Sequence, residues 1–230
     1  MCKDQRTPAT IEPVSDGQSD LLVQATKNYP GGKDKLNLAK GHPDFKKRLH
    51  ELLDKLADER ALQLPVEERP IWKSLQRSHD DAKGYITDLE ANDFRISDWA
   101  RDIMGKDGFS QAFDITDVNL VIASVKELTG QDSATTAEIY DAIRKVSGEL
   151  CSAWVGPELR KQYPDQPKGE WLIVAMETIT GSGGGPFVFG VGRNDYDRWL
   201  NADWDSPFDQ WYGRRRFVFC RRKQPSALRT

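Results

Sequence analysis

Cysteine and histidine are scarce in this chain, and their scarcity argues against a zinc site and against a disulfide framework. The three cysteines, Cys2, Cys151 and Cys220, show no CxxC spacing, and only three histidines accompany them. Structural zinc sites use closely spaced cysteines and histidines, whereas disulfide frameworks use even numbers of cysteines in secreted proteins. We therefore expect reduced thiols, no metal and no cofactor.

Long hydrophobic runs and a dominant charge are also absent. No stretch approaches the ~18 consecutive apolar residues of a membrane-spanning helix, and the first 20 residues contain charges in place of an apolar leader. The 33 Lys and Arg nearly balance the 36 Asp and Glu, which gives a formal net charge of −3. This balance argues against a globally basic nucleic-acid binder, but it permits a local basic patch. We expect a cytoplasmic protein with no membrane contact.

The chain is long enough for one domain with its own core, or for one domain and a small helical addition. Proline and glycine interrupt residues 1–40, which indicates a flexible arm or, alternatively, an arm that binds a partner. We expect a helical region over 41–108, an α+β domain over 109–223 and a tail over 224–230. The predicted fold class is α+β, with a helical N-terminal part followed by a mostly antiparallel or mixed sheet and short flanking helices.

Apolar residues recur at helical spacing in the first half of the chain. The pattern predicts one helix over 45–56 and a second that begins near Ile71 and carries a stripe to Leu89, so that the two would pack as an antiparallel hairpin. Ser97 is a good N-cap for a short third helix, which Gly105 would end.

The second half of the chain is expected to consist mainly of strands. Residues 118–125 are rich in β-branched side chains, which favours a buried strand, although the same spacing fits a helix. A helix capped by Ser133 or Thr135 follows, and 170–179 is expected to be a central strand. We expect the glycines of 181–185 to connect a hairpin, since no Lys-Ser/Thr and no helix follow them as a phosphate loop requires.

A dense group of polar and aromatic residues surrounds the predicted central strand. Arginine offers a planar fork for carboxylate or phosphate, while tyrosine and tryptophan add rigid contact area. These side chains would line a cleft between a helical turn at 157–162 and the sheet; alternatively, Arg160 pairs with Asp165 or Glu177 and only fastens the loop. The predicted ligand-binding residues are Arg160, Tyr163, Asp165, Gln166, Trp171 and Glu177.

The end of the chain is locally basic. Residues 212–230 contain six arginines and one lysine with no acid, which is the strongest indication of nucleic-acid binding in the sequence. Two other interpretations stay open, because the basic strand would also pair with the acidic segment 194–211 or protect a sheet edge. The predicted nucleic-acid-binding residues are Arg214, Arg215, Arg216, Arg221 and Arg222.

The acidic segment 194–211 offers oxygen ligands for Ca²⁺ or Mg²⁺, but its spacing does not match an EF-hand loop. We favour a loop whose aromatic residues close the core. Catalysis would have to rest on Glu177 and Asp165 as acid and base. No nucleophile elbow, Ser/His/Asp order or Cys/His pairing supports an enzyme, so no catalytic residue is predicted.

The second half resembles an uncharacterised bacterial family of hypothetical proteins. The resemblance covers residues 115–223, about half of the chain, and rests on Val155-Gly156-Pro157-Glu158-Leu159-Arg160, Gln162-Tyr163, Asp165-Gln166-Pro167, Gly169-Glu170-Trp171 and Arg216-Phe217-Val218-Phe219. It implies a strand over 118–125 but no activity, cofactor or catalytic residue. We expect a non-catalytic binding protein of bacterial or mobile-element origin with a protein or small-molecule partner. The alternatives are a nucleic-acid binder and an enzyme with acid/base carboxylates.

Overall fold

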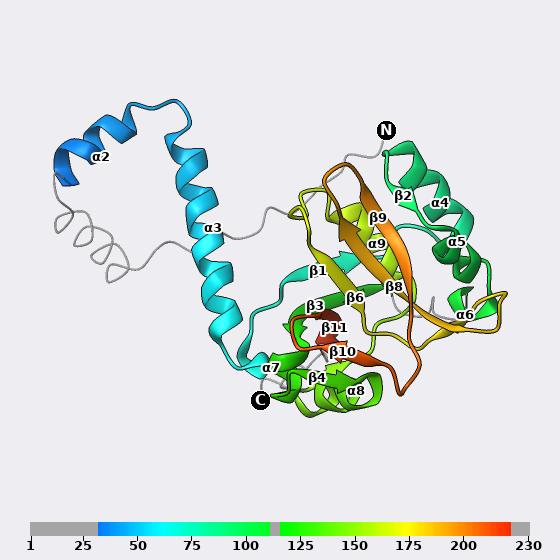
Figure 1. Cartoon of the computed structure of the whole chain (residues 1–230). Coiled ribbons are helices and arrows are strands. Elements are labelled where there is room, and N and C mark those ends of the chain that lie inside the picture. Colours follow the sequence, from blue (N-terminus) through cyan, green and yellow to red (C-terminus); the bar gives the residue numbers. More distant parts are fainter. Residues whose placement is uncertain (1–31, 111–115, 222–230) are drawn as a thin grey trace, which may run out of the picture. The chain divides into compact units, whose positions relative to one another are not determined.

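The computed structural model describes residues 32–110 and 116–221 (Figure 1). The chain forms two compact units, residues 1–59 and 60–230. The first contains α2 (Gly32–Lys40) and most of α3 (Phe45–Gln63). The helix predicted over 45–56 is therefore confirmed, and it continues to Gln63. None of the helices in the described ranges is long and apolar enough to cross a bilayer.

A mixed sheet forms the centre of the second unit. Its strands follow the order β1 (Lys73–Gln76), β3 (Asp117–Ser124), β11 (Arg216–Arg221), β6 (Trp171–Val174), β8 (Pro186–Arg193), β9 (Arg198–Trp204) and β2 (Arg95–Ile96). The β11–β6 and β9–β2 pairs are parallel and the other pairs along this path are antiparallel. Short pairs add β5 (Gly148–Glu149) to β11 and β7 (Ile179–Thr180) to β8. The predicted α+β class is confirmed.

Helices cover one face of this sheet. These are α4 (Ala82–Ala91), α5 (Asp98–Met104), α6 (Asp107–Ser110) and α9 (Val155–Gln162). Phe189 marks the contact, because it meets Phe109 of α6 edge-on and lies directly against Gly156 of α9. A side chain at Gly156 would collide with the Phe189 ring, so the absence of one permits this close approach.

The opposite face is covered at its β3–β11 side. There α7 (Val125–Thr129), α8 (Thr136–Lys145) and a small sheet of β4 (Ser133–Thr135) with β10 (Gln210–Tyr212) form a second layer (Figure 1). Trp211 of β10 meets Phe217 of β11 edge-on at 5.4 Å between ring centroids. Cys151 and Cys220 are buried free thiols with Sγ atoms 3.4 Å apart.

The predicted second helix is wrong over its first part. Residues 73–76 form β1, whose Leu75 is buried while Ser74 and Gln76 are exposed. Its pairing with β3 satisfies the backbone in an extended form. The helix itself begins only at Ala82, where the Asp81 carboxylate accepts from Gly84 N at 2.7 Å. The region 41–108, which was expected to be helical, thus supplies β1 and β2 to the sheet.

Other local predictions are confirmed. Residues 117–124 form β3, and Ser97 caps α5, which ends before Gly105. Thr135 caps α8 through a capping box with Glu138. The single strand expected over 170–179 is wrong over 175–178, which separates β6 from β7, whereas 181–185 connects β7 to β8 as expected.

Candidate nucleic-acid interface

Arg160 lies at the centre of the predicted ligand-binding residues, but it is fully buried. Its Nη1 donates to Gln166 Oε1 at 2.5 Å and to Gly192 O at 3.0 Å, and its Nη2 donates to Tyr163 O. Burial, with Arg198 nearby, lowers the pKa of the guanidinium to about 10, so it stays charged at neutral pH. Arg160 therefore fastens the loop after α9 to β8.

The rest of the predicted set does not form a cleft around Arg160. Gln166 is also fully buried and donates from Nε2 to Val191 O at 3.1 Å, while Asp165 and Glu177 are exposed. The Arg160 guanidinium itself fills the space between the helical turn and the sheet where a cleft was expected. Neither Asp165 nor Glu177 forms an ion pair with it. Trp171 is the member of the set that lines an open groove.

The predicted basic patch is divided between the two ends of β11, which lie about 17 Å apart at the usual rise per strand residue. At the far end, Arg221 donates to Val66 O, Glu67 O and Arg69 O at 2.7–3.1 Å. These carbonyls accept from both Nη atoms of Arg221, so Arg221 fixes the turn at 66–69. Arg222 lies outside the described residues.

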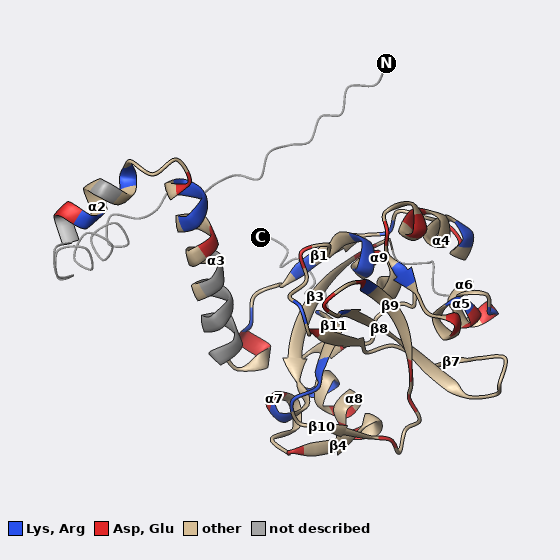
Figure 2. Cartoon of the chain, turned by 45° about the horizontal axis from the view of Figure 1, so that its top comes forward, with Lys and Arg blue, Asp and Glu red and all other residues tan. Residues whose placement is uncertain are grey.

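The near end of β11 borders a groove of about 590 Å³. Because β6 and β11 are parallel, with Leu172 opposite Arg216, the residues that precede both strands meet at one edge of the sheet. Figure 2 shows the basic stretch between β10 and β11 in blue. Lys168 and Tyr212, which no sequence pattern indicated, also line this groove. The lining residues are Pro167, Lys168, Gly169, Glu170, Trp171, Tyr212, Arg214, Arg215 and Arg216.

Positive charge exceeds negative charge in the groove. Arg216 Nη1 pairs with Glu170 Oε1 at 2.6 Å, and Lys168 Nζ lies 4.0 Å from Asp195, which is exposed. Within the described part of the chain, Arg214 and Arg215 form no ion pair, although Arg215 interacts electrostatically with the buried Asp203.

Aromatic rings hold these two arginines. The Arg214 guanidinium lies 5.5 Å from the centroid of Tyr212, and the Arg215 guanidinium lies 5.9 Å from the centroid of Trp211. Both distances are within the range of cation–π attraction. Burial raises the pKa of the nearby Asp203 carboxyl, and the charge of Arg215 acts against this shift.

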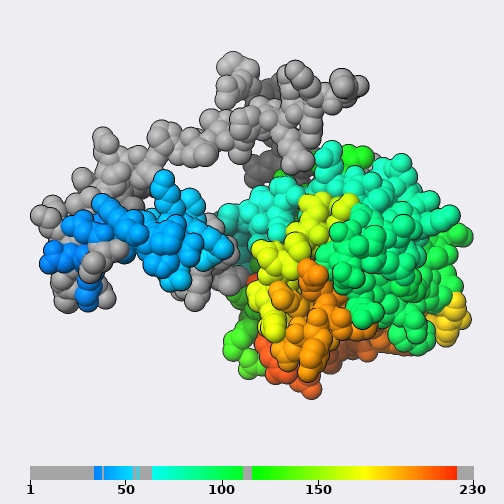
Figure 3. Space-filling view, turned by 90° about the horizontal axis from the view of Figure 1, so that it is seen from above, coloured from blue at the N-terminus to red at the C-terminus, as the bar shows by residue number. Residues whose placement is uncertain are grey.

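Trp171 lies on the backbone of the neighbouring strand. It is opposite Gly192 of β8, and a Cβ at that glycine would come within 2.1 Å of the indole Cε3. The glycine thus lets the ring lie close to the sheet. The loop before it, 167–170, is held by Gly169 N, which donates to Arg193 O at 2.8 Å. In Figure 3 the yellow stretch that includes this loop lies beside the orange β9.

The acids of 194–211 serve other purposes than cation binding. Asp197 pairs with Arg95, and Asp209 accepts from Ser206 N at 2.5 Å. Asp205 is buried and accepts from Thr136, Tyr140 and Trp211. Throughout 32–110 and 116–221, no three His, Cys, Asp or Glu side chains converge as metal ligands would.

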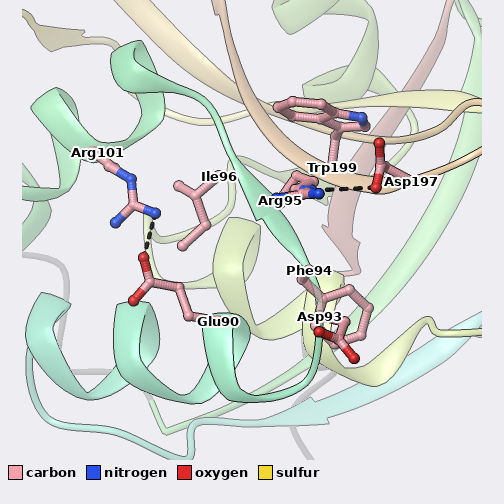
Figure 4. Close-up of a pocket in the computed structure, with 8 residues that line it drawn as sticks. All are labelled: Glu90, Asp93, Phe94, Arg95, Ile96, Arg101, Asp197 and Trp199. Carbon is pink, nitrogen blue, oxygen red and sulfur yellow. Dashed lines mark hydrogen bonds and ion pairs between the residues drawn. The ribbon is translucent and has the colours of Figure 1, made fainter.

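A second cavity of about 450 Å³ lies beside β2 (Figure 4). Arg95 pairs there with Asp197 at 3.2 Å, and Arg101 pairs with Glu90 at 2.5 Å. Figure 4 shows the two pairs on opposite sides of the cavity. Since each arginine has its own carboxylate, this cavity is a weaker anion site than the groove at 167–171 and 212–216. Comparison of the chain with protein-family models, curated proteins and solved structures gives no match.

Proposed function

We propose that the protein binds the phosphate backbone of a nucleic acid in the groove formed by 167–171 and 212–216. The observation that carries the proposal is the pair Arg214 and Arg215, which line the groove without an ion pair to any described acid. Arginine presents a planar fork of donors that matches phosphate oxygens. Lys168 adds a third cation with only a distant, exposed partner.

The aromatic residues favour a nucleic acid over a small inorganic anion. Trp171 and Tyr212 line the groove beside the arginines, and Tyr212 is 70% exposed. A sulfate-sized ligand would gain nothing from these rings, whereas nucleotides combine phosphate with flat apolar bases. The net charge of −3 opposes long-range attraction of a polyanion, so binding depends on these local contacts and weakens steeply with salt.

The test is fluorescence anisotropy with a labelled oligonucleotide over a range of salt concentrations. Wild type is compared with R214A/R215A and with the control R144A/K145A, which removes the same charge from the exposed end of α8. For a single strand, each phosphate contact contributes about 0.7 to the slope of log K against log salt. We expect R214A/R215A to flatten the slope by about 1.4 and to weaken binding, while the control keeps the wild-type slope.

Two results would contradict the proposal. One is wild-type protein that binds no oligonucleotide even at low salt and is purified with a protein-like 260/280 absorbance ratio. The other is an equal loss of affinity in both double variants, because binding would then follow total charge and not the groove.

A further inference from the structure

We infer that the groove selects single-stranded nucleic acid, with an unpaired base stacked on the indole of Trp171 and the adjoining phosphates held by Arg214 and Arg215. This inference rests on the proposed function and adds to it the strand type and the residue that selects it. It follows from the position of one tryptophan relative to Gly192 and from the contacts made by other aromatic residues.

Trp171 is placed with one side against the sheet. Its indole lies over Gly192, where a Cβ would approach within 2.1 Å, so that side contacts backbone. The residue is partly exposed and lines the groove. Among the described residues it takes part in no ring–ring or cation–π contact. Its other face is therefore available to a flat ligand.

Other tryptophans of the second unit are already engaged. Trp99 stacks on Phe187 with ring centroids 5.1 Å apart, and Trp204 meets Phe187 edge-on at 5.6 Å. Trp211 contacts both Phe217 and Arg215. Contacts with neighbouring rings account for these three positions, whereas Trp171 makes no such contact with a described residue.

Only an unpaired base can stack on an indole ring placed in this way. In a duplex, each base is covered on both faces by its neighbours, so its faces are not accessible to a side chain. Stacking of one base on an aromatic side chain contributes enough to change affinity about tenfold. A duplex would keep the phosphate contacts of Arg214 and Arg215 and lose the stacking contact.

Tyr212 has a different role in this arrangement. Arg214 lies over its ring at 5.5 Å, so the tyrosine positions the cation beside the groove. The phosphate-binding and base-stacking parts are thus carried by different elements, the segment 212–215 and the start of β6. Each part can be removed without the other, which makes the inference testable apart from the proposed function.

The experiment measures binding of a labelled single strand and of its duplex to the full chain at one low salt concentration. The variants are W171L, W171F and the control W99L. Trp99 is 51% exposed on α5, which covers the opposite face of the sheet. Thermal unfolding of each variant first verifies that it is folded. Wild type should bind the single strand about tenfold more tightly than the duplex.

We expect W171L to lose this preference by weakening single-strand binding alone, W171F to keep most of it, and W99L to match wild type. Equal, salt-dependent binding of strand and duplex that W171L leaves unchanged would overturn this inference while the proposed function stands. A fall in W171F as large as that in W171L would also overturn it. Absence of binding to either probe by wild type would overturn both.

Discussion

Asp205 provides a sharp test of how the second layer is attached to the sheet. The side chain is fully buried just after β9. Its Oδ1 accepts from Thr136 Oγ1 and from Trp211 Nε1, and its Oδ2 lies 3.0 Å from the Tyr140 hydroxyl. These partners belong to α8 and β10, so one carboxyl joins both elements to the strand.

The hydrogen bonds around Tyr140 favour a protonated Asp205 over an ionised one. The Tyr140 hydroxyl has one hydrogen but lies 3.0 Å both from Met176 O and from Asp205 Oδ2. Burial raises the pKa of Asp205 above its ordinary value, and its hydrogen-bond donors only partly oppose this. When Oδ2 is protonated it donates to Tyr140 in place of accepting from it, the tyrosine hydrogen is then free for Met176 O, and every partner is satisfied.

We therefore expect D205N to be tolerated and D205A to be harmful. Asparagine retains an acceptor at Oδ1 and supplies a donor in place of the protonated Oδ2, so the cost should stay below about 1 kcal/mol. Alanine leaves the buried Thr136 hydroxyl without its acceptor and opens a small cavity, at a cost of about 2–4 kcal/mol. For a unit of this size, this corresponds to a fall in Tm of roughly 5–15 °C.

Thermal and urea unfolding at several pH values test the reasoning. The pKa of Asp205 is higher in the folded state than in the unfolded state. Its contribution to the free energy of unfolding is therefore fully present below the unfolded-state pKa of about 3.9 and is lost as pH rises through the folded-state pKa. D205N should remove this part of the pH dependence. If D205N cost as much as D205A, the site would require an ionised carboxylate and the reasoning would be wrong.

Two further predictions concern surface attachments. Ser182, through its hydroxyl and backbone N–H, and Lys106 lower the pKa of Asp102 to about 2, so the stability that this group contributes is present above about pH 4 and is lost as pH falls toward 2. An NMR titration of the Asp102 carboxyl carbon checks this, and an ordinary pKa would contradict it. R221A should lower the free energy of unfolding by about 1–3 kcal/mol, because the carbonyls of 66–69 lose their donors. Urea unfolding measures this change. The affinity of R221A for an oligonucleotide should be unchanged, because Arg221 does not line the groove.

Local sequence signals predicted much of the fold. The caps at Ser97 and Thr135 and the β-branched run of β3 specify their elements through contacts within a few residues. The error at 73–76 has a physical cause: Trp72 and Leu75 are three residues apart, which fits a helix, and Leu75 is the one apolar residue of this four-residue strand, so no alternation is visible. Pairing with β3, more than forty residues away, decides between them.

The groove was harder to predict because it depends on parallel pairing of distant segments. Nothing in 167–171 or in 212–216 alone indicates that they meet, and their register comes from Leu172 opposite Arg216. The sequence did select Trp171 and Arg214, but it assigned them to two different sites. It also gave Arg160 and Arg221 binding roles, because an arginine that donates mainly to backbone carbonyls of its own fold has no distinctive sequence pattern.

The distribution of acids explains how a chain of net charge −3 presents a basic groove. The sequence permitted the acidic segment 194–211 to neutralise the arginines that follow it. Instead, Asp197 pairs with Arg95 across the sheet edge, and Asp205 is buried among hydroxyl and indole donors. Asp203 is held in a buried environment that disfavours its charge. These acids are thus either paired elsewhere or buried, and Arg214 and Arg215 form no ion pair with them.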